Sequence, residues 1–98
     1  MVLVQLLLPA TSAAHETHVA QTRAELTARF GGVTAYQRAP ALGAWVNDDG
    51  RLERDDVIMV EVVADTFDRT WWRAYRTELE ARFAQTEIHV RALSIMVP

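Results

Sequence analysis

The 98-residue sequence predicts an α+β domain whose elements follow the order β-α-β-β-α-β. The first observation behind this prediction is an octapeptide that occurs twice, as RAELTARF in residues 23–30 and as RTELEARF in residues 76–83. The second is that each copy follows an apolar run, residues 2–8 or residues 57–64, with the composition of a strand. The third is a polar turn signal in residues 47–50, midway along the chain. Together they indicate two equivalent β-α-β halves at an offset of 53 residues, joined by a hairpin.

The first half begins with a strand and continues with a helix. Residues 2–8 form a nearly continuous apolar run that Pro9 ends, which is typical of a central strand covered on both faces. The Thr-Ser pair at residues 11–12 can cap a helix over residues 13–30. The glycines of residues 31–32 then end this helix, because glycine adopts the left-handed conformation without strain. The core positions of the helix recur at steps of three and four residues: Val19, Thr22, Leu26 and Phe30.

A bent second strand leads into the central hairpin. Residues 33–38 alternate in polarity as a strand does, and Pro40 and Gly43 interrupt them before residues 45–46 resume an extended path. The Asn-Asp-Asp-Gly sequence of residues 47–50 is a strong reverse-turn signal. The chain should therefore reverse here and return as the third strand.

The second half repeats the plan of the first. Residues 57–64 are rich in β-branched side chains and predict the third strand. Asp65 is a candidate N-cap for a second helix that continues to about residue 83, and residues 87–97 predict a long fourth strand. The core positions of the second helix have the same steps as those of the first: Trp72, Tyr75, Leu79 and Phe83.

This element order is the plan of a ferredoxin-like domain, a four-stranded antiparallel sheet in order 4-1-3-2 with both helices on one face. With its FGGVT segment at residues 30–34 and its GAW segment at residues 43–45, the sequence resembles the dimeric α/β-barrel kind. That superfamily includes small monooxygenases, muconolactone isomerases and uncharacterised bacterial proteins. The resemblance covers residues 1–98 as a single domain. It implies a homodimer whose two sheets face each other around a substrate space, and it supplies no catalytic motif.

Composition excludes several kinds of chemistry. The chain has no cysteine and no lysine, which excludes thiol nucleophiles, thiolate metal sites, disulfides and Schiff-base lysines. The absence of cysteine favours the cytoplasm, and the bias toward arginine and alanine is typical of a GC-rich bacterial genome. A net charge of -3, with arginines interspersed among acidic residues, disfavours nucleic acid as a partner. The apolar run of residues 2–8 is too short for a membrane span, and no positive charge precedes it as in a secretion signal.

One face of the predicted sheet is free of helices and needs a cover. Alternate residues of each strand point to this face, and we assign to it the rows that contain polar residues. These rows are Leu3, Gln5 and Leu7; Val57, Met59, Glu61 and Val63; and His89, Arg91, Leu93, Ile95 and Val97. Such a face is too apolar for water, and a second copy of the chain is its simplest cover. We therefore predict a homodimer through the helix-free sheet face.

The polar residues of this face are the candidate site. Glu61 and Gln5 should lie side by side on adjacent central strands, and burial in a dimer cavity would raise the pKa of the Glu61 carboxyl. Glu61 or His89 could then act as a catalytic base, while Gln5, Tyr36 and Arg91 orient a ligand. In the alternative, which we favour, Glu61 pairs with Arg91 or with an arginine of the partner subunit and only fixes the interface.

A metal site is a weaker hypothesis. His15 and His18 are three residues apart and lack the four-residue spacing of the zincin helix, although His89 could be a third ligand. A half-buried His15 and a solvated His18 are the simpler interpretation. We therefore predict no metal and no cofactor.

Three functional hypotheses follow from these patterns. The leading one is a small homodimeric binding or interaction module without catalysis of its own. The second is a cofactor-independent enzyme of the monooxygenase or isomerase type, acting on a small apolar or aromatic ligand in the dimer cavity. The third is a metal-assisted enzyme that uses the histidines. Whether the chain is an enzyme stays open at this point, because similarity of fold alone does not establish an activity.

Overall fold

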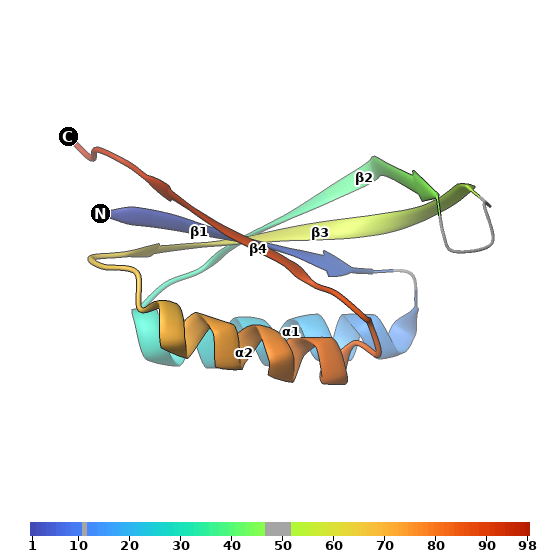
Figure 1. The fold of residues 1–98 in the computed structure, drawn as a ribbon, viewed down its shortest axis with the longest axis horizontal. Helices are drawn as coiled ribbons and strands as arrows, with labels where there is room; N and C mark the ends of the chain where they lie inside the picture. Colours follow the sequence, from blue (N-terminus) through green and yellow to red (C-terminus); the bar gives the residue numbers. More distant parts are fainter. Residues whose placement is uncertain (11, 47–51) are drawn as a thin grey trace.

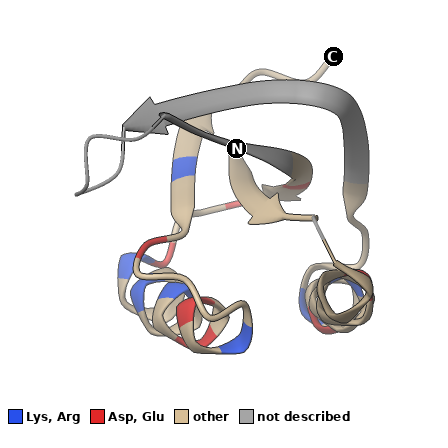
Figure 2. Cartoon of the chain, turned by 90° about the vertical axis from the view of Figure 1, so that its right-hand side faces the viewer, with Lys and Arg blue, Asp and Glu red and all other residues tan. Residues whose placement is uncertain are grey.

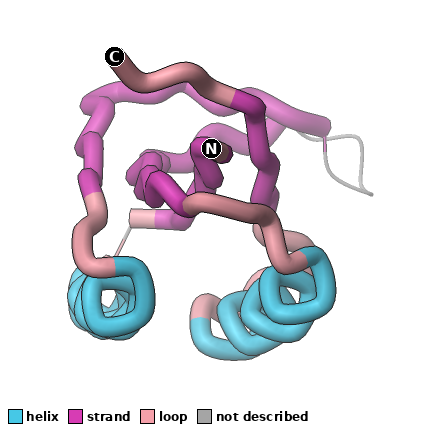
Figure 3. Tube along the Cα trace, turned by 90° about the vertical axis from the view of Figure 1, so that its left-hand side faces the viewer, coloured by secondary structure: helices cyan, strands magenta, loops and turns pink. Residues whose placement is uncertain are grey.

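The computed structural model describes the backbone of residues 1–10, 12–46 and 52–98, and the side chains of residues 1–10, 12–34 and 57–98. Both helices lie on the same side of an antiparallel sheet (Figure 1, Figure 3), so the predicted α+β class is confirmed. The elements along the chain are β1 (Val2–Pro9), α1 (Ala13–Phe30), β2 (Thr34–Val46), β3 (Leu52–Ala64), α2 (Arg69–Arg82) and β4 (His89–Ser94).

Strand β1 is the centre of the sheet. It pairs antiparallel with β3, from Val2↔Ala64 to Pro9↔Val57, and on its other side antiparallel with β4, from Val2↔Ser94 to Leu7↔His89. The backbone of β2 pairs with β3, and the register shifts between Arg38 and Gly43, where Pro40 interrupts the alternation. The strand order is β2-β3-β1-β4. The predicted turn at residues 47–50 lies outside the described residues.

Helix α2 begins three residues later than predicted. The side chain of Asp68 accepts a hydrogen bond from the backbone N–H of Trp71 at 3.1 Å, which makes Asp68, and not Asp65, the N-cap. In α1 the expected cap is present, because the Ser12 hydroxyl accepts from the backbone N–H of His15 at 3.2 Å. Asp and Ser are both favoured caps, so the sequence alone could not choose between two aspartates three residues apart.

Strand β4 is shorter than the predicted residues 87–97. Just before it, the backbone N–H of Ile88 donates to the Glu80 carboxylate of α2 at 3.2 Å. At its end, the backbone N–H of Ile95 donates to the Met1 carbonyl at 3.1 Å, one residue beyond the strand itself. Strand β4 therefore covers residues 89–94 of the predicted 87–97.

The core lies between the sheet and the two helices. Leu26 and Leu79, which occupy the same position in the two octapeptides, are both completely buried. Burying a leucine side chain stabilises a fold by roughly 1.5–3 kcal/mol, so the repeat marks the two helix faces that hold the sheet. Other side chains with at most 3% exposure are Val4, Leu6, Leu8, Thr22, Val60, Val62, Trp72, Phe83 and Ile88.

Arg82 of the second octapeptide links the two helices. Its guanidinium donates to both carboxylate oxygens of Glu25, at 2.7 and 2.9 Å, and to the Thr22 hydroxyl at 2.9 Å. The Tyr75 hydroxyl donates to the same carboxylate at 2.8 Å. The Arg82 side chain is only 8% exposed, whereas that of Glu25 is 37% exposed. The four side chains form a bidentate, hydrogen-bonded network between α1 and α2.

This network shifts the ionisation of its members. The hydrogen bonds from Arg82 lower the pKa of the Glu25 carboxyl below its ordinary value, against burial, which would raise it. Burial, together with the bond to Glu25, raises the pKa of the Tyr75 hydroxyl. For Arg82, burial lowers the pKa, but the hydrogen bond and charge of Glu25 outweigh it, and the net pKa is raised.

An aromatic cluster packs the region around the start of α2. Phe30 stacks on Trp72 with ring centres 5.4 Å apart, and Trp71 stacks on Tyr75 at 4.9 Å. The guanidinium of Arg29, the counterpart of Arg82 in the first octapeptide, lies 4.1 Å from the centre of a Trp71 ring. Arg29 and Arg82 occupy equivalent positions in the two octapeptides but have different roles. Arg29 makes a cation–π contact, and Arg82 makes an ion pair.

The chain leaves each helix through a left-handed residue, which is a glycine in one half only. Gly31 has φ 83, and Ala84, its counterpart at the 53-residue offset, has φ 52. A side chain in this conformation costs about 1–2 kcal/mol.

We expect Ala84→Gly to raise the free energy of unfolding by about 0.5–1 kcal/mol in chemical denaturation, because the relief of strain exceeds the entropy lost on folding a glycine. Ala81→Gly, inside α2, should lower it by a similar amount. A loss of stability in Ala84→Gly would contradict this account.

Glu25 should support stability at neutral pH and lose that contribution in acid. Its pKa in the folded state lies below the ordinary value of 4.5, so its contribution is complete above pH 4.5 and is lost as the pH falls through the lower, folded value. We expect Glu25→Gln to lower the free energy of unfolding at pH 7 by about 1–2 kcal/mol, and to flatten its decline below pH 4.5.

The matched control for this prediction is Glu78→Gln. Glu78 occupies the same position in the second octapeptide and contacts the same arginine at 3.3 Å, but it is 59% exposed. Exposed pairs of this kind contribute little, so the expected change is below about 0.5 kcal/mol. Equal effects of the two variants in urea titrations across pH 3 to 7 would show that the network is no stronger than a surface ion pair.

Candidate functional site

Three polar side chains form a continuous row across the helix-free face, and we call Arg91, Gln5 and Glu61 the polar row. Gln5 is paired with Glu61 of β3 and with Arg91 of β4 in the sheet register. Its side-chain Nε2 donates to Oε2 of Glu61 at 2.6 Å, and its Oε1 accepts from Nε of Arg91 at 2.6 Å. One neutral amide therefore joins a cation to a carboxylate, and the two charges fix the orientation of the amide.

The alternation of the strands places this row on the helix-free face. Gln5 lies between Val4 and Leu6, which are completely buried, and its side chain must point the opposite way. Glu61 lies between Val60 and Val62, which are at most 1% exposed. The assignment of rows to the two faces from the sequence is therefore confirmed for β1 and β3, and it brings Gln5, Glu61 and Arg91 together.

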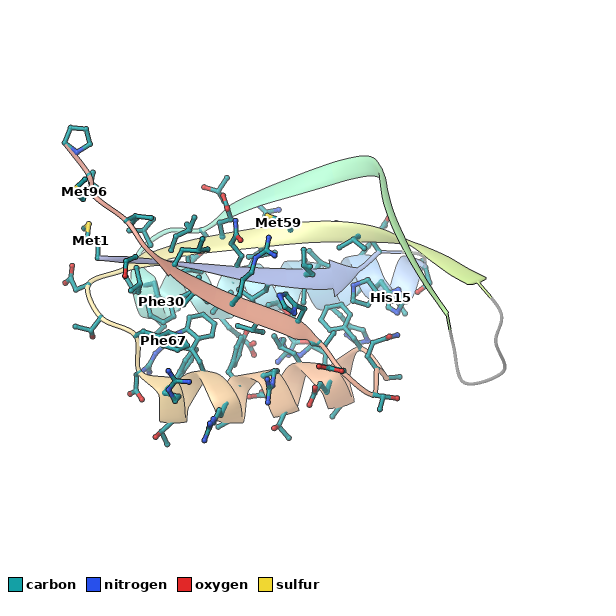
Figure 4. The ribbon with its side chains drawn as sticks, turned by 45° about the horizontal axis from the view of Figure 1, so that its top comes forward. Met1, His15, Phe30, Met59, Phe67 and Met96 are labelled. Atoms are coloured by element: carbon teal, nitrogen blue, oxygen red, sulfur yellow. The ribbon has the colours of Figure 1, made fainter. Side chains whose placement is uncertain are left out.

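Apolar residues flank the polar row on both sides. On one side the register aligns Leu93, Leu3 and Val63, and on the other it aligns His89, Leu7 and Met59. Val63 and Leu93 are each 45% exposed. In Figure 4, Met59 lies on the side of the sheet away from the helices, whereas Phe30 and Phe67 lie on the helix side. We call the polar row and these two flanking rows the open face.

The ends of the polar row can bind a further group. Within the described residues, Oε1 of Glu61 and the two Nη atoms of Arg91 have no hydrogen-bond or ion-pair partner. Glu61 is half-buried and Arg91 is exposed. The face thus offers an acceptor above β3, donors above β4, and apolar contact on either side. This arrangement suits a charged surface of opposite polarity, or a ligand with both donors and acceptors.

His89 and Tyr36, the two other predicted site residues, belong to the next row. His89 is exposed and pairs with Leu7, which pairs with Met59, whose partner on β2 is Tyr36. The side chain of Tyr36 lies outside the described residues. His89 is therefore on the predicted face, one row away from Glu61, and no contact between them marks it as a base.

The two histidines of α1 pack against the core. The ring centres of His15 and His18 lie 5.8 and 5.5 Å from that of Phe83. His18 is half-buried, and its Nδ1 is enclosed without a hydrogen-bond partner, so the expectation of a solvated His18 is wrong. Within the described residues, no three metal-binding side chains gather at one place.

A second feature, which the sequence analysis missed, is a groove of about 490 Å³ between α2 and β4. It is lined by Val2, Phe67, Arg69, Trp72, Arg73, Arg76 and residues 90–94, and none of these is acidic. We call it the arginine groove. Figure 2 shows basic residues of α2 on the side of the molecule where β4 lies. The signal in the sequence was the spacing of Arg69, Arg73 and Arg76 by four and three residues, which the net charge of -3 conceals.

The helices of the described residues are α1 and α2. Neither combines the length and the apolar content that crossing a membrane requires.

Comparison with known proteins gives a fold and no family. No protein-family model matches the chain, and no curated protein matches its sequence. Among solved structures, the chain is similar to a phage SAM lyase in complex with S-methyl-5'-thioadenosine. The TM-score is 0.61 at 12% sequence identity, over 95% of this chain and 80% of that one. At this identity the similarity is one of fold alone: a small α+β domain with two helices and an antiparallel sheet.

Proposed function

We propose that this chain is a small binding module of the cytoplasm that self-associates, with the open face of one copy packed against the open face of a second. In this proposal the fold is ferredoxin-like, of the dimeric α/β-barrel kind, and the module needs no cofactor. The strand order β2-β3-β1-β4, with both helices on one face, supports this assignment.

The observation that carries the proposal is the composition of the open face. A row joining a cation to a carboxylate runs between two rows that are largely apolar, including Leu93 and Val63 at 45% exposure each. Apolar area arranged in this way on a sheet is typical of an interface, and the polar row can set the register of the partner. A second copy offers the same apolar rows and complementary charges.

The polarity of the row selects one orientation of the two copies. The row is positive above β4, neutral above β1 and negative above β3. A two-fold axis parallel to the strands and above β1 places β4 of one copy over β3 of the other. Arg91 then faces Glu61 of the partner subunit, Gln5 faces its own counterpart, and each apolar row faces the same row of the second copy.

The other face-to-face arrangement is disfavoured by charge. A two-fold axis perpendicular to the strands would place Arg91 over Arg91 of the partner subunit, and Glu61 over Glu61 of the partner subunit. Like charges brought together in an interface cost several kcal/mol, roughly the binding energy of a weak dimer. The parallel axis is therefore the one that we propose.

Charge reversal tests this dimer. We expect the wild type to sediment as a dimer at micromolar concentration, and Arg91→Glu or Glu61→Arg to weaken the dimer by about 100-fold, because each variant opposes like charges. The double variant R91E/E61R should restore dimerisation, since it reverses the whole row and the Gln5 amide can turn to match.

The control for the charge reversals is Glu87→Arg. Glu87 is exposed and precedes β4, so its reversal changes the net charge without touching the open face. A wild type that stays monomeric, or single variants that dimerise like the wild type, would overturn the proposed interface. A double variant as weak as the singles would overturn the parallel axis.

A second candidate is cofactor-independent catalysis on a small apolar or aromatic ligand held between two open faces. Glu61 or His89 would be the base, with Gln5, Tyr36 and Arg91 as ligand contacts. The observation in favour is Oε1 of Glu61, a half-buried carboxylate oxygen that has no partner among the described residues. It ranks second because the described pocket lies between α2 and β4, and Gln5, Glu61 and His89 are not among its lining residues.

Ligand binding separates the two candidates. S-methyl-5'-thioadenosine, with which the similar phage SAM lyase is in complex, is a suitable small aromatic probe. If the chain is only a module, we expect no change of Tm at millimolar probe in differential scanning fluorimetry. A rise of Tm that Glu61→Gln abolishes and Glu87→Gln retains would favour the enzymatic alternative.

A further inference from the structure

We propose that the arginine groove binds an extended acidic peptide, which adds to β4 as a further strand and places its carboxylates against the arginines of α2. This inference goes beyond the proposed function. It concerns the outer edge of β4 and the adjacent face of α2, whereas self-association would use the open face.

Strand β4 offers a free backbone edge. It pairs with β1 on one side, and the sheet order places it last, so no described strand lies on its other side. Because the backbone N–H of Ile95 donates to Met1, the odd-numbered residues of β4 direct their backbone groups toward β1. The N–H and C=O groups of Val90, Ala92 and Ser94 therefore point away from β1, and all three residues line the groove.

The arginines that face this edge have no carboxylate partner among the described residues. Arg69, Arg73 and Arg76 are exposed, and none makes an ion pair within the described residues. The acidic side chains of the same helix are engaged elsewhere, since Glu78 contacts Arg82 and Glu80 accepts from the backbone of Ile88. Three arginines without a carboxylate form a local positive site on a chain of net charge -3.

The spacing of the arginines matches a strand. Steps of four and three residues along a helix correspond to about 6 and 4.5 Å. Side chains on one face of a strand recur about every 6.5–7 Å, and arginine side chains are long enough to accommodate the difference. A peptide with acidic residues at alternate positions would therefore present successive carboxylates to Arg69, Arg73 and Arg76.

The edge itself favours a peptide over other anions. An exposed strand edge presents carbonyl oxygens as well as N–H groups, and a peptide backbone satisfies both kinds. A phosphate group satisfies only the donors, and the carbonyl oxygens would repel it. A second copy of the chain in edge-to-edge pairing would bring the arginines of both copies together, which disfavours self-pairing here. The groove also offers apolar contact through Val2, Phe67 and Val90, which are half-buried.

Fluorescence anisotropy with a labelled peptide tests the proposal. The probe is a heptapeptide that alternates acidic and valine residues, and the matched probe has the same composition with its acidic residues consecutive. We expect micromolar binding of the alternating peptide, at least tenfold weaker binding of the consecutive one, and weakening by added salt. Arg73→Gln and Arg76→Gln should each reduce the affinity at least fivefold.

Arg23→Gln is the control variant, because Arg23 occupies the position of Arg76 in the first octapeptide and is exposed on α1. It should leave the affinity unchanged. In amide hydrogen exchange, the bound peptide should protect Val90, Ala92 and Ser94, which a carboxylate-only contact would not do. Loss of binding in Arg73→Gln together with unchanged sedimentation would separate this site from the open face.

Four outcomes would each overturn the proposal. Equal affinity for the two peptides would mean that charge alone decides, without strand addition. Competition by pyrophosphate at the same concentration would indicate a site for small anions. Tighter binding of a labelled single-stranded oligonucleotide than of the peptide would indicate a nucleic-acid surface. Absence of peptide binding in the wild type would also refute it.

Discussion

The central position of β1 is the constraint on which the rest of the structure depends. Strand β1 pairs on both sides, so its alternate residues must serve two different environments. Val4, Leu6 and Leu8 fill the core under the helices, and none of them is exposed to solvent. Gln5, which lies among them, must then point to the other face, where only β3 and β4 can supply its partners. One polar residue in an apolar strand thus determines where the polar row forms.

The internal repeat explains the symmetry of the fold, but equivalent positions of the repeat do not all have equivalent surroundings. Leu26 and Leu79 are equivalent in sequence and equally buried. The arginines at equivalent positions are not equivalent in structure, because Arg82 lies between the helices with Glu25 while Arg29 lies against Trp71. The repeat supplies the glutamate and the arginine of this pair twice, as Glu25 and Glu78 and as Arg29 and Arg82. Only Arg82 and Glu25 form the bidentate pair that joins α1 to α2.

Local patterns predicted the element order, the two core stripes and the neighbours of Gln5, because periodicity and antiparallel register are properties of the sequence itself. The boundaries that were missed depend on tertiary contacts, which local patterns do not contain. The burial of His18 under Phe83 was missed for the same reason. The arginine groove was missed because composition averages charge over the whole chain. Its residues come from α2 and β4, and only the fold shows that no carboxylate lies among them.

Strand β4 takes part in both proposed surfaces, and its geometry keeps them apart. Arg91 and Leu93 point their side chains to the open face, while the backbone of Val90, Ala92 and Ser94 faces the outer edge. Side-chain direction and hydrogen-bonding direction are perpendicular in a strand, so a peptide along the edge leaves the open face uncovered. A second copy on the open face likewise leaves the edge of β4 accessible. The same six residues can therefore support self-association and peptide binding at once, and the peptide would extend the sheet by one strand while the two sheets stay face to face.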